Sequence, residues 1–216
     1  MHFDKYGLIV SDLSGMPSAA GDSAAETGRW LHLKILLDEP RDISVINNFR
    51  TIGGYVRHPS PLLPYDWRES DFSSDQWLPL FLAARAAPFY QFWIEMVTRL
   101  REAGWRTGNG NLCSPILYAL VNENQWLINM CVAAQALLFK LPWRWSDSAK
   151  RFESTQNSTG DYLNWLHAAI HADPWARKLV NPTKLVTKIE SYYATEIGTG
   201  ELLDLYRRLI KKVYGL

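Results

Sequence analysis

Three carboxylates stand near predicted helix starts, where they could supply an acid and a base for a hydrolytic reaction. Asp22 and Glu26 lie in GDSAAETGRW (residues 21–30), and Asp75 lies in FSSDQWLPL (residues 72–80). The positive end of a helix dipole stabilises such carboxylates. If both helices begin at the same end of a bundle, these acids face one cleft, as paired carboxylates do in enzymes that cleave glycosidic bonds. We take Asp22, Asp75 and Glu26 as candidate catalytic residues.

The first of these stretches also has a structural explanation. Ser23 and Glu26 have the Ser-x-x-Glu spacing of a capping box, in which each side chain satisfies a backbone amide of the other. Gly28 lies inside the same predicted helix, where glycine costs about 1 kcal/mol relative to alanine. We therefore expect another chain segment or a ligand to approach Gly28 closely.

The second stretch presents the same choice between chemistry and helix capping. Pro79 limits where its helix begins, because proline is tolerated only near a helix start. Asp75 or Gln76 is therefore the expected helix boundary, in preference to Ser73. If these residues serve only to cap their helices, Asp22 and Asp75 are two ordinary capping residues and not a catalytic pair.

Between the two helices runs a long proline-rich loop, predicted over residues 53–73, with aromatic side chains that argue against disorder. Its arginine could bind a sugar acid, or pair with Asp22 or Asp75 to hold the loop in place. Tryptophan and tyrosine side chains could stack on sugar rings or fill a core. The candidate substrate-binding residues are Arg57, His58, Tyr65, Trp67 and Trp77.

The remaining candidates for chemistry are two histidines and two cysteines. His167 and His171 lie four residues apart on a predicted helix, a spacing that can hold a metal or can simply belong to a solvated face. The zinc-protease pattern needs Glu after the first His, and this chain has Ala168 there. We expect no metal and no cofactor, and we expect Cys113 and Cys131 to be reduced thiols.

Helical periodicity dominates the chain. Buried-face spacing predicts a helix within residues 88–104, and another within 114–142 that Asn122–Asn124 may divide in two. Further helices are predicted at 22–37, 147–155, 159–173, 181–196 and 201–216. The expected fold is all-α, a single domain (residues 1–216) of antiparallel helix pairs or a partial α/α toroid. Residues 1–20 form an N-terminal arm, in which residues 6–15 could make a short hairpin.

Composition narrows the function classes. The net charge of +1 gives no overall basic field, so we expect no nucleic-acid partner. No apolar run is long enough to span a bilayer, and no signal peptide is visible at the N-terminus. We expect a cytoplasmic protein, or one released without a signal peptide, whose partner is a glycan or another protein.

Three motifs resemble those of uncharacterised bacterial and bacteriophage proteins that carry GDSAxxTG, Arg-His-Pro and Phe-Ser-x-Asp-Gln. Here the motifs read GDSAAETG (21–28), YVRHPS (55–60) and FSSDQWLPL (72–80). More loosely, the chain resembles α/α-toroid carbohydrate-active enzymes, whose acids at helix starts line an aromatic cleft. That resemblance implies a glycoside hydrolase or polysaccharide lyase. The alternative is a non-enzymatic helical protein that binds another protein, with Asp22, Arg57 and Asp75 in a structural network.

Overall fold

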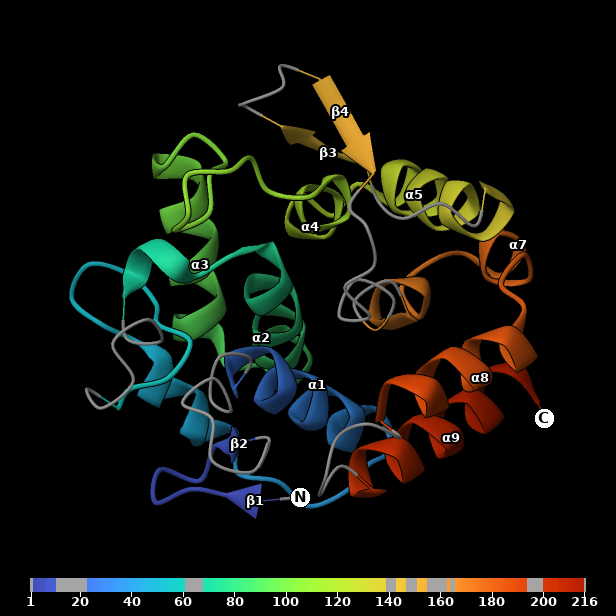
Figure 1. Cartoon of the computed structure of the whole chain (residues 1–216), viewed down its shortest axis with the longest axis horizontal. Helices are drawn as coiled ribbons and strands as arrows, with labels where there is room; N and C mark the ends of the chain where they lie inside the picture. The colour runs from blue at the N-terminus through green and yellow to red at the C-terminus, as the bar shows by residue number, and fades with distance from the viewer. Residues whose placement is uncertain are drawn as a thin grey trace.

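The computed structural model describes residues 2–10, 23–60, 68–138, 143–146, 151–154, 163, 166–193 and 200–215. Most of these residues are helical, which confirms the predicted all-α class (Figure 1). The named elements are β1 (His2–Phe3), β2 (Ile9–Val10), α1 (Ser23–Leu36), η2 (Ile43–Phe49), η3 (Glu69–Asp71), α2 (Ser74–Ala86), α3 (Tyr90–Glu102), α4 (Pro115–Val121), α5 (Gln125–Leu138), β3 (Trp143–Ser146), β4 (Arg151–Ser154), α7 (Pro174–Arg177), α8 (Pro182–Tyr193) and α9 (Gly200–Tyr214).

Helices α1 and α2 pack together at the centre of the core and approach most closely at Gly28. A Cβ atom at Gly28 would lie 2.7 Å from the backbone nitrogen of Leu80 and 2.7 Å from the carbonyl carbon of Pro79. Only glycine permits this approach, because any side chain would overlap the backbone of α2. The close approach expected at Gly28 is therefore confirmed, and α2 is the segment that makes it.

The predicted starts of these two helices were wrong in detail. Ser23 is the first residue of α1, and its buried hydroxyl has no hydrogen-bond partner among the residues described, so the predicted capping box is not formed. Ser73, not Asp75 or Gln76, caps α2, and the Gln76 side-chain oxygen accepts the Ser73 backbone N–H at 3.0 Å. Pro79 lies in the second turn of α2, and its ring packs over Gly28, which has no side chain.

Helices α3, α4 and α5 follow their sequence signals closely. Beyond the end of α3, Gly104 has φ +61°, and the Trp105 amide donates to the Leu100 carbonyl at 2.7 Å, which satisfies the helix end as in a Schellman motif. The predicted division at 122–124 is confirmed, because α4 ends at Val121 and α5 begins at Gln125. The Ser114 hydroxyl caps α4 by accepting the Leu117 amide at 3.3 Å.

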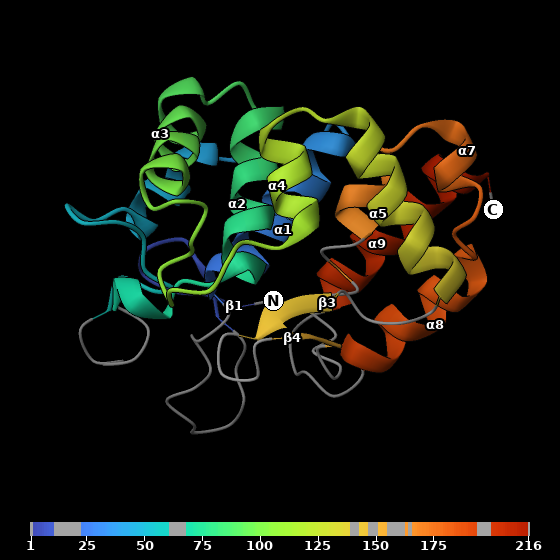
Figure 2. The same cartoon turned by 90° about the horizontal axis from the view of Figure 1, so that it is seen from above.

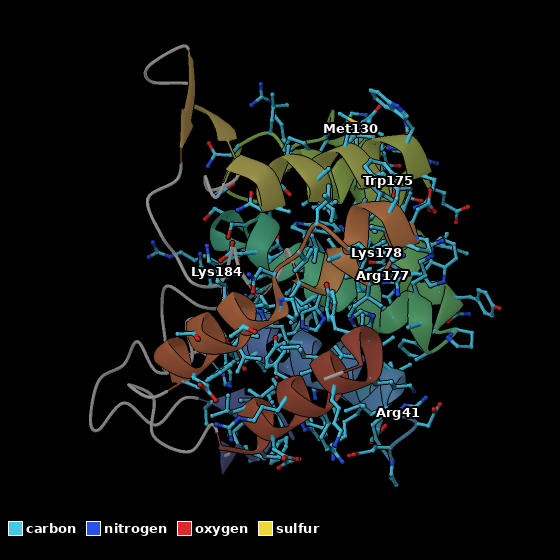
Figure 3. All side chains as sticks on the ribbon, turned by 90° about the vertical axis from the view of Figure 1, so that its right-hand side faces the viewer. Arg41, Met130, Trp175, Arg177, Lys178 and Lys184 are labelled. Carbon is cyan, nitrogen blue, oxygen red and sulfur yellow. The ribbon has the colours of Figure 1, made fainter. Side chains whose placement is uncertain are left out.

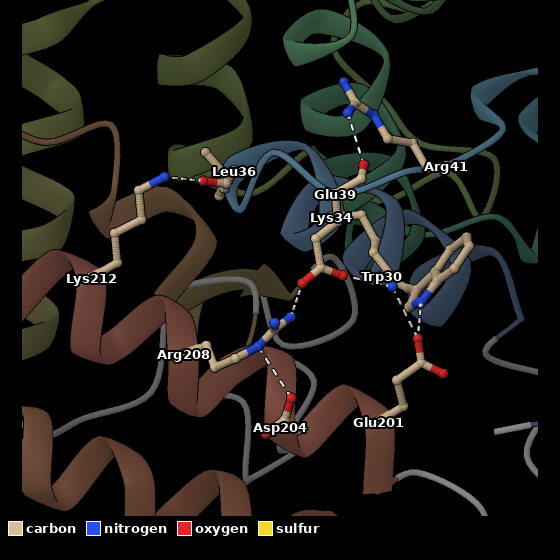
Figure 4. A network of polar contacts seen from close by, with 9 residues as sticks. All are labelled: Trp30, Lys34, Leu36, Glu39, Arg41, Glu201, Asp204, Arg208 and Lys212. Atoms are coloured by element: carbon tan, nitrogen blue, oxygen red, sulfur yellow. Dashed lines mark hydrogen bonds and ion pairs between the residues drawn. The ribbon is translucent and has the colours of Figure 1, made fainter.

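The C-terminal helices α8 and α9 close the core against α1. Figure 1 shows α9 running back along α8, and Figure 2, seen from above, shows α4 in front of α1 and α5 in front of α9. A network of polar contacts joins the outer edges of α1 and α9 (Figure 4). In it Lys34 Nζ lies 2.7 Å from Glu39 Oε2 and 3.3 Å from Glu201 Oε1, while Lys212 donates to the Leu36 carbonyl at 2.8 Å.

Two short antiparallel hairpins accompany the helices. β1 pairs with β2, so the hairpin of the N-terminal arm lies within residues 2–10, whereas residues 11–15 of the hairpin predicted at 6–15 lie outside the described residues. β3 pairs with β4, which corrects the helix predicted at 147–155 over residues 151–154. Tryptophan and polar residues alternate in Trp143–Ser146, the period of a strand.

We expect Gly28→Ala to lower the free energy of unfolding by about 1–3 kcal/mol, because the added methyl group forces α1 and α2 apart. Gly200→Ala is the matched control, since a Cβ there would meet nothing within 4 Å. Urea unfolding measures both variants. A Gly28→Ala protein as stable as the control would contradict the close packing of the two helices.

Candidate functional site

The predicted catalytic carboxylates fall into different environments. Asp22 lies outside the described residues. Asp75 lies in the first turn of α2, where its carboxylate accepts hydrogen bonds from the Ser73 hydroxyl and, at 3.2 Å, from the Gln76 amide. Glu26 is only 3 % exposed, and its carboxylate accepts a hydrogen bond from the buried Arg29 side chain. The distance between Asp22 and Asp75 therefore stays untested, and so does the proposed acid–base pair.

Two of the five predicted substrate-binding residues, His58 and Trp77, are used by the fold. His58 is buried, with Nε2 2.8 Å from Asp4 Oδ2 and Nδ1 accepting the Ser60 amide at 3.1 Å, so neither ring nitrogen is available to orient a substrate. Trp77 is buried with its ring centroid 5.2 Å from that of Tyr55, which corrects its role as a sugar platform. Tyr65 and Trp67 lie outside the described residues.

The three sequence motifs nevertheless meet around the starts of α1 and α2. The Ala24 amide donates to the Arg57 carbonyl at 3.1 Å, which ties the Arg-His-Pro segment to the first turn of α1. Tyr55 packs against Phe72, with ring centroids 5.7 Å apart, and against Trp77. The glycan-active enzyme predicted from these motifs stays a prediction, because Asp22, Tyr65 and Trp67 are needed to form its cleft.

A buried ion pair lies deeper in the same helix. Arg29 Nη1 and Glu26 Oε1 are 2.5 Å apart, and their side chains are 2 % and 4 % exposed. The other carboxylate oxygen of Glu26 accepts a hydrogen bond from the Tyr193 hydroxyl at 3.0 Å. A buried arginine needs such a partner, because an uncompensated charge in the core costs several kcal/mol.

A second group of polar side chains continues from Tyr193. Its hydroxyl is hydrogen-bonded to that of Tyr206 on α9, and the two rings stack with centroids 5.9 Å apart. The Tyr206 hydroxyl lies 2.8 Å from His167 Nε2, and His167 Nδ1 lies 2.7 Å from His32 Nδ1. The described contacts therefore form one buried chain from Glu26 to His32.

Burial, aided by neighbouring cations, keeps the histidines neutral. Burial lowers the pKa of His32 well below its usual value, with His167 and His171 adding to the effect. Burial and then Arg29 lower the pKa of His167 in the same direction. Burial, followed by Arg85 and Arg177, lowers the pKa of His171 to about 4.

His171 stacks on His32, with ring centroids 5.6 Å apart. The expectation of a solvated helix face for His167 and His171 was therefore wrong, because the helix packs between α1 and α9. No group of three or more metal-ligating side chains in the described part of the chain could hold a metal ion.

The donor and acceptor roles are fixed at the first end of this buried chain. Glu26 lies beside Arg29 and accepts, so the Tyr193 hydroxyl donates to it. Farther along, the roles of His167 and His32 follow from which ring nitrogen of each neutral histidine carries the proton. Where the two Nδ1 atoms meet, one ring donates and the other accepts.

Sequence reasoning missed this network, although α1 carried a signal for it. Glu26, Arg29 and His32 recur every third residue in α1, whose other residues before Lys34 are small or apolar. Such polar residues on one face of a buried helix require partners from other helices. Their partners, Tyr193 and His167, lie 167 and 135 residues away, at distances that no local pattern spans.

An exposed face on α5 and α7 is the second notable feature (Figure 3). The two helices are joined by Asn129, whose amide donates to the Asp173 carboxylate at 2.6 Å. Trp126 and Trp175 are 69 % and 52 % exposed, and Met130 and Leu179 add further exposed apolar surface. We call Trp126, Met130, Trp175 and Leu179 the α5/α7 face.

Comparisons with family models, with curated proteins and with solved structures gave no match. Over the described ranges, no helix is long and apolar enough to cross a membrane. Cys113 and Cys131 form no disulfide, and burial raises the pKa of each thiol to about 11, which keeps both protonated.

We expect Glu26→Gln to lower the free energy of unfolding by about 3–5 kcal/mol, because Arg29 keeps its buried charge and loses its counterion. The matched control is Glu190→Gln, which removes an exposed pair with Arg207 and should cost no more than about 1 kcal/mol. Chemical denaturation measures both. Equal losses of unfolding free energy in the two variants would contradict the stronger dependence of the fold on the buried Glu26–Arg29 pair.

We also expect stability to fall as the pH drops below about 6.5, the ordinary pKa of histidine. The folded-state pKa values of His32, His167 and His171 are lowered, so the unfolded chain binds more protons. Each histidine thus contributes stability that is complete above pH ~6.5 and lost as the pH falls toward its folded pKa, with a slope of up to about 1.4 kcal/mol per pH unit.

Denaturation curves between about pH 6.5 and 4.5 test this expectation, because ordinary carboxylates titrate mainly below that window. The charged and titratable groups around the cluster are Glu26, Arg29, Arg85, Arg177 and Tyr206. Replacing His171 by Asn should reduce the number of protons taken up on unfolding in this window by about one. The slope of unfolding free energy against pH should fall accordingly. An unchanged slope in that variant would contradict the neutral state of His171.

Proposed function

We propose that the protein binds a partner protein through the α5/α7 face. The observation that carries the proposal is the exposure of two tryptophans, Trp126 and Trp175, on helices that pack side by side. Large contiguous apolar surfaces on soluble domains mark interaction sites, and tryptophan is the residue most enriched in their energetic centres.

The spacing of the exposed side chains fits a helical partner. Trp126 and Met130 lie four residues apart on α5, and Trp175 and Leu179 lie four residues apart across α7 and its end. The α5 pair therefore projects from one side of its helix. Figure 3 shows Met130 and Trp175 one above the other on the face turned to the viewer. An apolar row on α5 with Trp175 beside it suits the apolar stripe of an amphipathic helix.

Charge indicates an acidic partner. The sequence of α5 contains no charged residue, and the cations Arg177 and Lys178 follow Trp175, labelled beneath it in Figure 3. The one carboxylate of this segment, Asp173, is hydrogen-bonded to Asn129. An acidic amphipathic helix would match this surface, because complementary charge guides association and fixes orientation.

A fluorescence-anisotropy titration tests the proposal with a labelled helical peptide that carries leucines on one face and glutamates on the other. We expect saturable binding, and we expect Trp175→Ala to weaken it at least about tenfold, as for a residue at an energetic centre. The control is Tyr90→Ala, which removes a 61 % exposed aromatic side chain from α3 and should leave binding unchanged.

Three outcomes would overturn this proposal. The first is equal binding of the same peptide with lysine in place of glutamate. The second is sedimentation of the free protein as a dimer that Trp175→Ala dissociates, which would make a second copy the occupant. The third is binding of phosphatidylserine vesicles, lost in Trp175→Ala, in the absence of peptide binding.

A further inference from the structure

Three histidine rings are in contact where α1 meets the segment 166–171. His32 and His167 are fully buried, with their Nδ1 atoms 2.7 Å apart and their ring centroids 4.9 Å apart. The ring of His171 stacks on that of His32, with centroids 5.6 Å apart. Two Nδ1 atoms at this distance can share only one proton, so His32 and His167 cannot both become imidazolium ions while the contact lasts.

The same stretch of chain holds α7 against α5. Gln125 on α5 donates to the His171 carbonyl at 3.0 Å. The Asn129 side chain makes two hydrogen bonds with Asp173, the residue that precedes α7: its amide donates to the carboxylate at 2.6 Å, and its oxygen accepts the backbone N–H at 2.8 Å. These bonds fix Trp175, in the first turn of α7, beside α5. The position of the α5/α7 face therefore depends on residues 171–173.

The groups around the three rings oppose an added positive charge. The ionisable side chains that face the rings from the surrounding elements are Glu26 and Arg29 on α1, Arg85 on α2, Arg177 on α7, Tyr193 on α8 and Tyr206 on α9. The carboxylate among them, Glu26, is bonded to Arg29 and Tyr193. Burial, followed by Arg85 and Arg177, lowers the pKa of His171 to about 4. The rings therefore bind protons more readily outside the core than inside it.

We propose that acid detaches residues 166–173 from α1 and thereby separates α7 from α5, so that the α5/α7 face holds its partner near neutral pH and releases it in acid. Detachment exposes the histidine rings, and each then binds a proton as an ordinary histidine does. The hydrogen bonds from Gln125 and Asn129 break in the same step, because their partners lie on the segment that leaves. The release of a partner rests on the function proposed for this face, whereas the opening does not.

Hydrogen exchange of the Asp173 amide, followed by NMR in the free protein, tests the opening. This amide donates to Asn129, so it exchanges when that hydrogen bond breaks. We expect its protection factor to fall at least about a hundredfold from pH ~7.5 to pH ~5.5, because each histidine exposed by the opening favours the open form about tenfold over this range and the segment carries two. At the lower pH the exchange should not accelerate in dilute urea, since a local opening exposes little surface.

Two variants assign the effect to the histidine cluster. His171→Asn removes one of the protons taken up, so the fall in protection should be about tenfold smaller than in the wild type. The matched control is His58→Asn, which replaces a buried histidine that pairs with Asp4 outside this segment and should leave the fall unchanged.

Three results would overturn the acid opening. They are equal protection of the Asp173 amide at the two pH values, a fall in His171→Asn as large as in the wild type, and exchange that accelerates with urea as global unfolding does. If His171→Asn does not fold, the pH and urea dependences of the wild type decide the matter.

The acidic helical peptide used to test the α5/α7 face also tests the link between this face and the opening. At about 100 times its Kd, the peptide should raise the protection factor of the Asp173 amide about a hundredfold at pH ~5.5, because it binds only the closed form. A peptide that binds without changing this protection would overturn the link. If no peptide binds, the function proposed for the face fails, while the exchange data on the free protein still decide whether acid opens the segment.

Discussion

The buried charge of Arg29 is the constraint on which the rest of the core depends. A guanidinium that is 2 % exposed must be neutralised within the protein, and Glu26 does this from the same helix at 2.5 Å. Glu26 then needs a donor for its second oxygen, which Tyr193 supplies from α8. One charge in α1 therefore fixes how α8, and through Tyr206 also α9, must dock. The apolar residues around them give the core its stability, and this pair gives it a defined arrangement.

The same charge acts on one of the buried histidines. Burial and then Arg29 lower the pKa of His167, so the ring stays neutral and can accept as well as donate. A protonated His167 would carry a proton on both nitrogens, so His32 Nδ1 could only accept from it.

Features that depend on neighbouring residues were predictable from the sequence. The helix within 88–104 and the break at 122–124 depend on spacing over a few residues, and both were identified correctly. Gly28 also indicated a close helix contact. The capping box at Ser23 was wrong because Glu26 finds stronger partners at long range. Trp77 was assigned to a surface because its row of aromatics gave no sign that Tyr55 and Phe72 would enclose it.

The contacts between α1 and α9 bear on how the chain reaches its folded state. Trp30 and Glu201 are hydrogen-bonded across 171 residues, and Lys212 reaches the Leu36 carbonyl across 176. Contacts so distant in sequence form late, since the closure entropy of the intervening loop must be overcome first. During synthesis, α1 emerges from the ribosome long before Tyr193 and Tyr206 exist, so its arginine stays solvated and its apolar residues stay open. The nascent N-terminal half, with its apolar residues exposed, is therefore the species that a chaperone would bind.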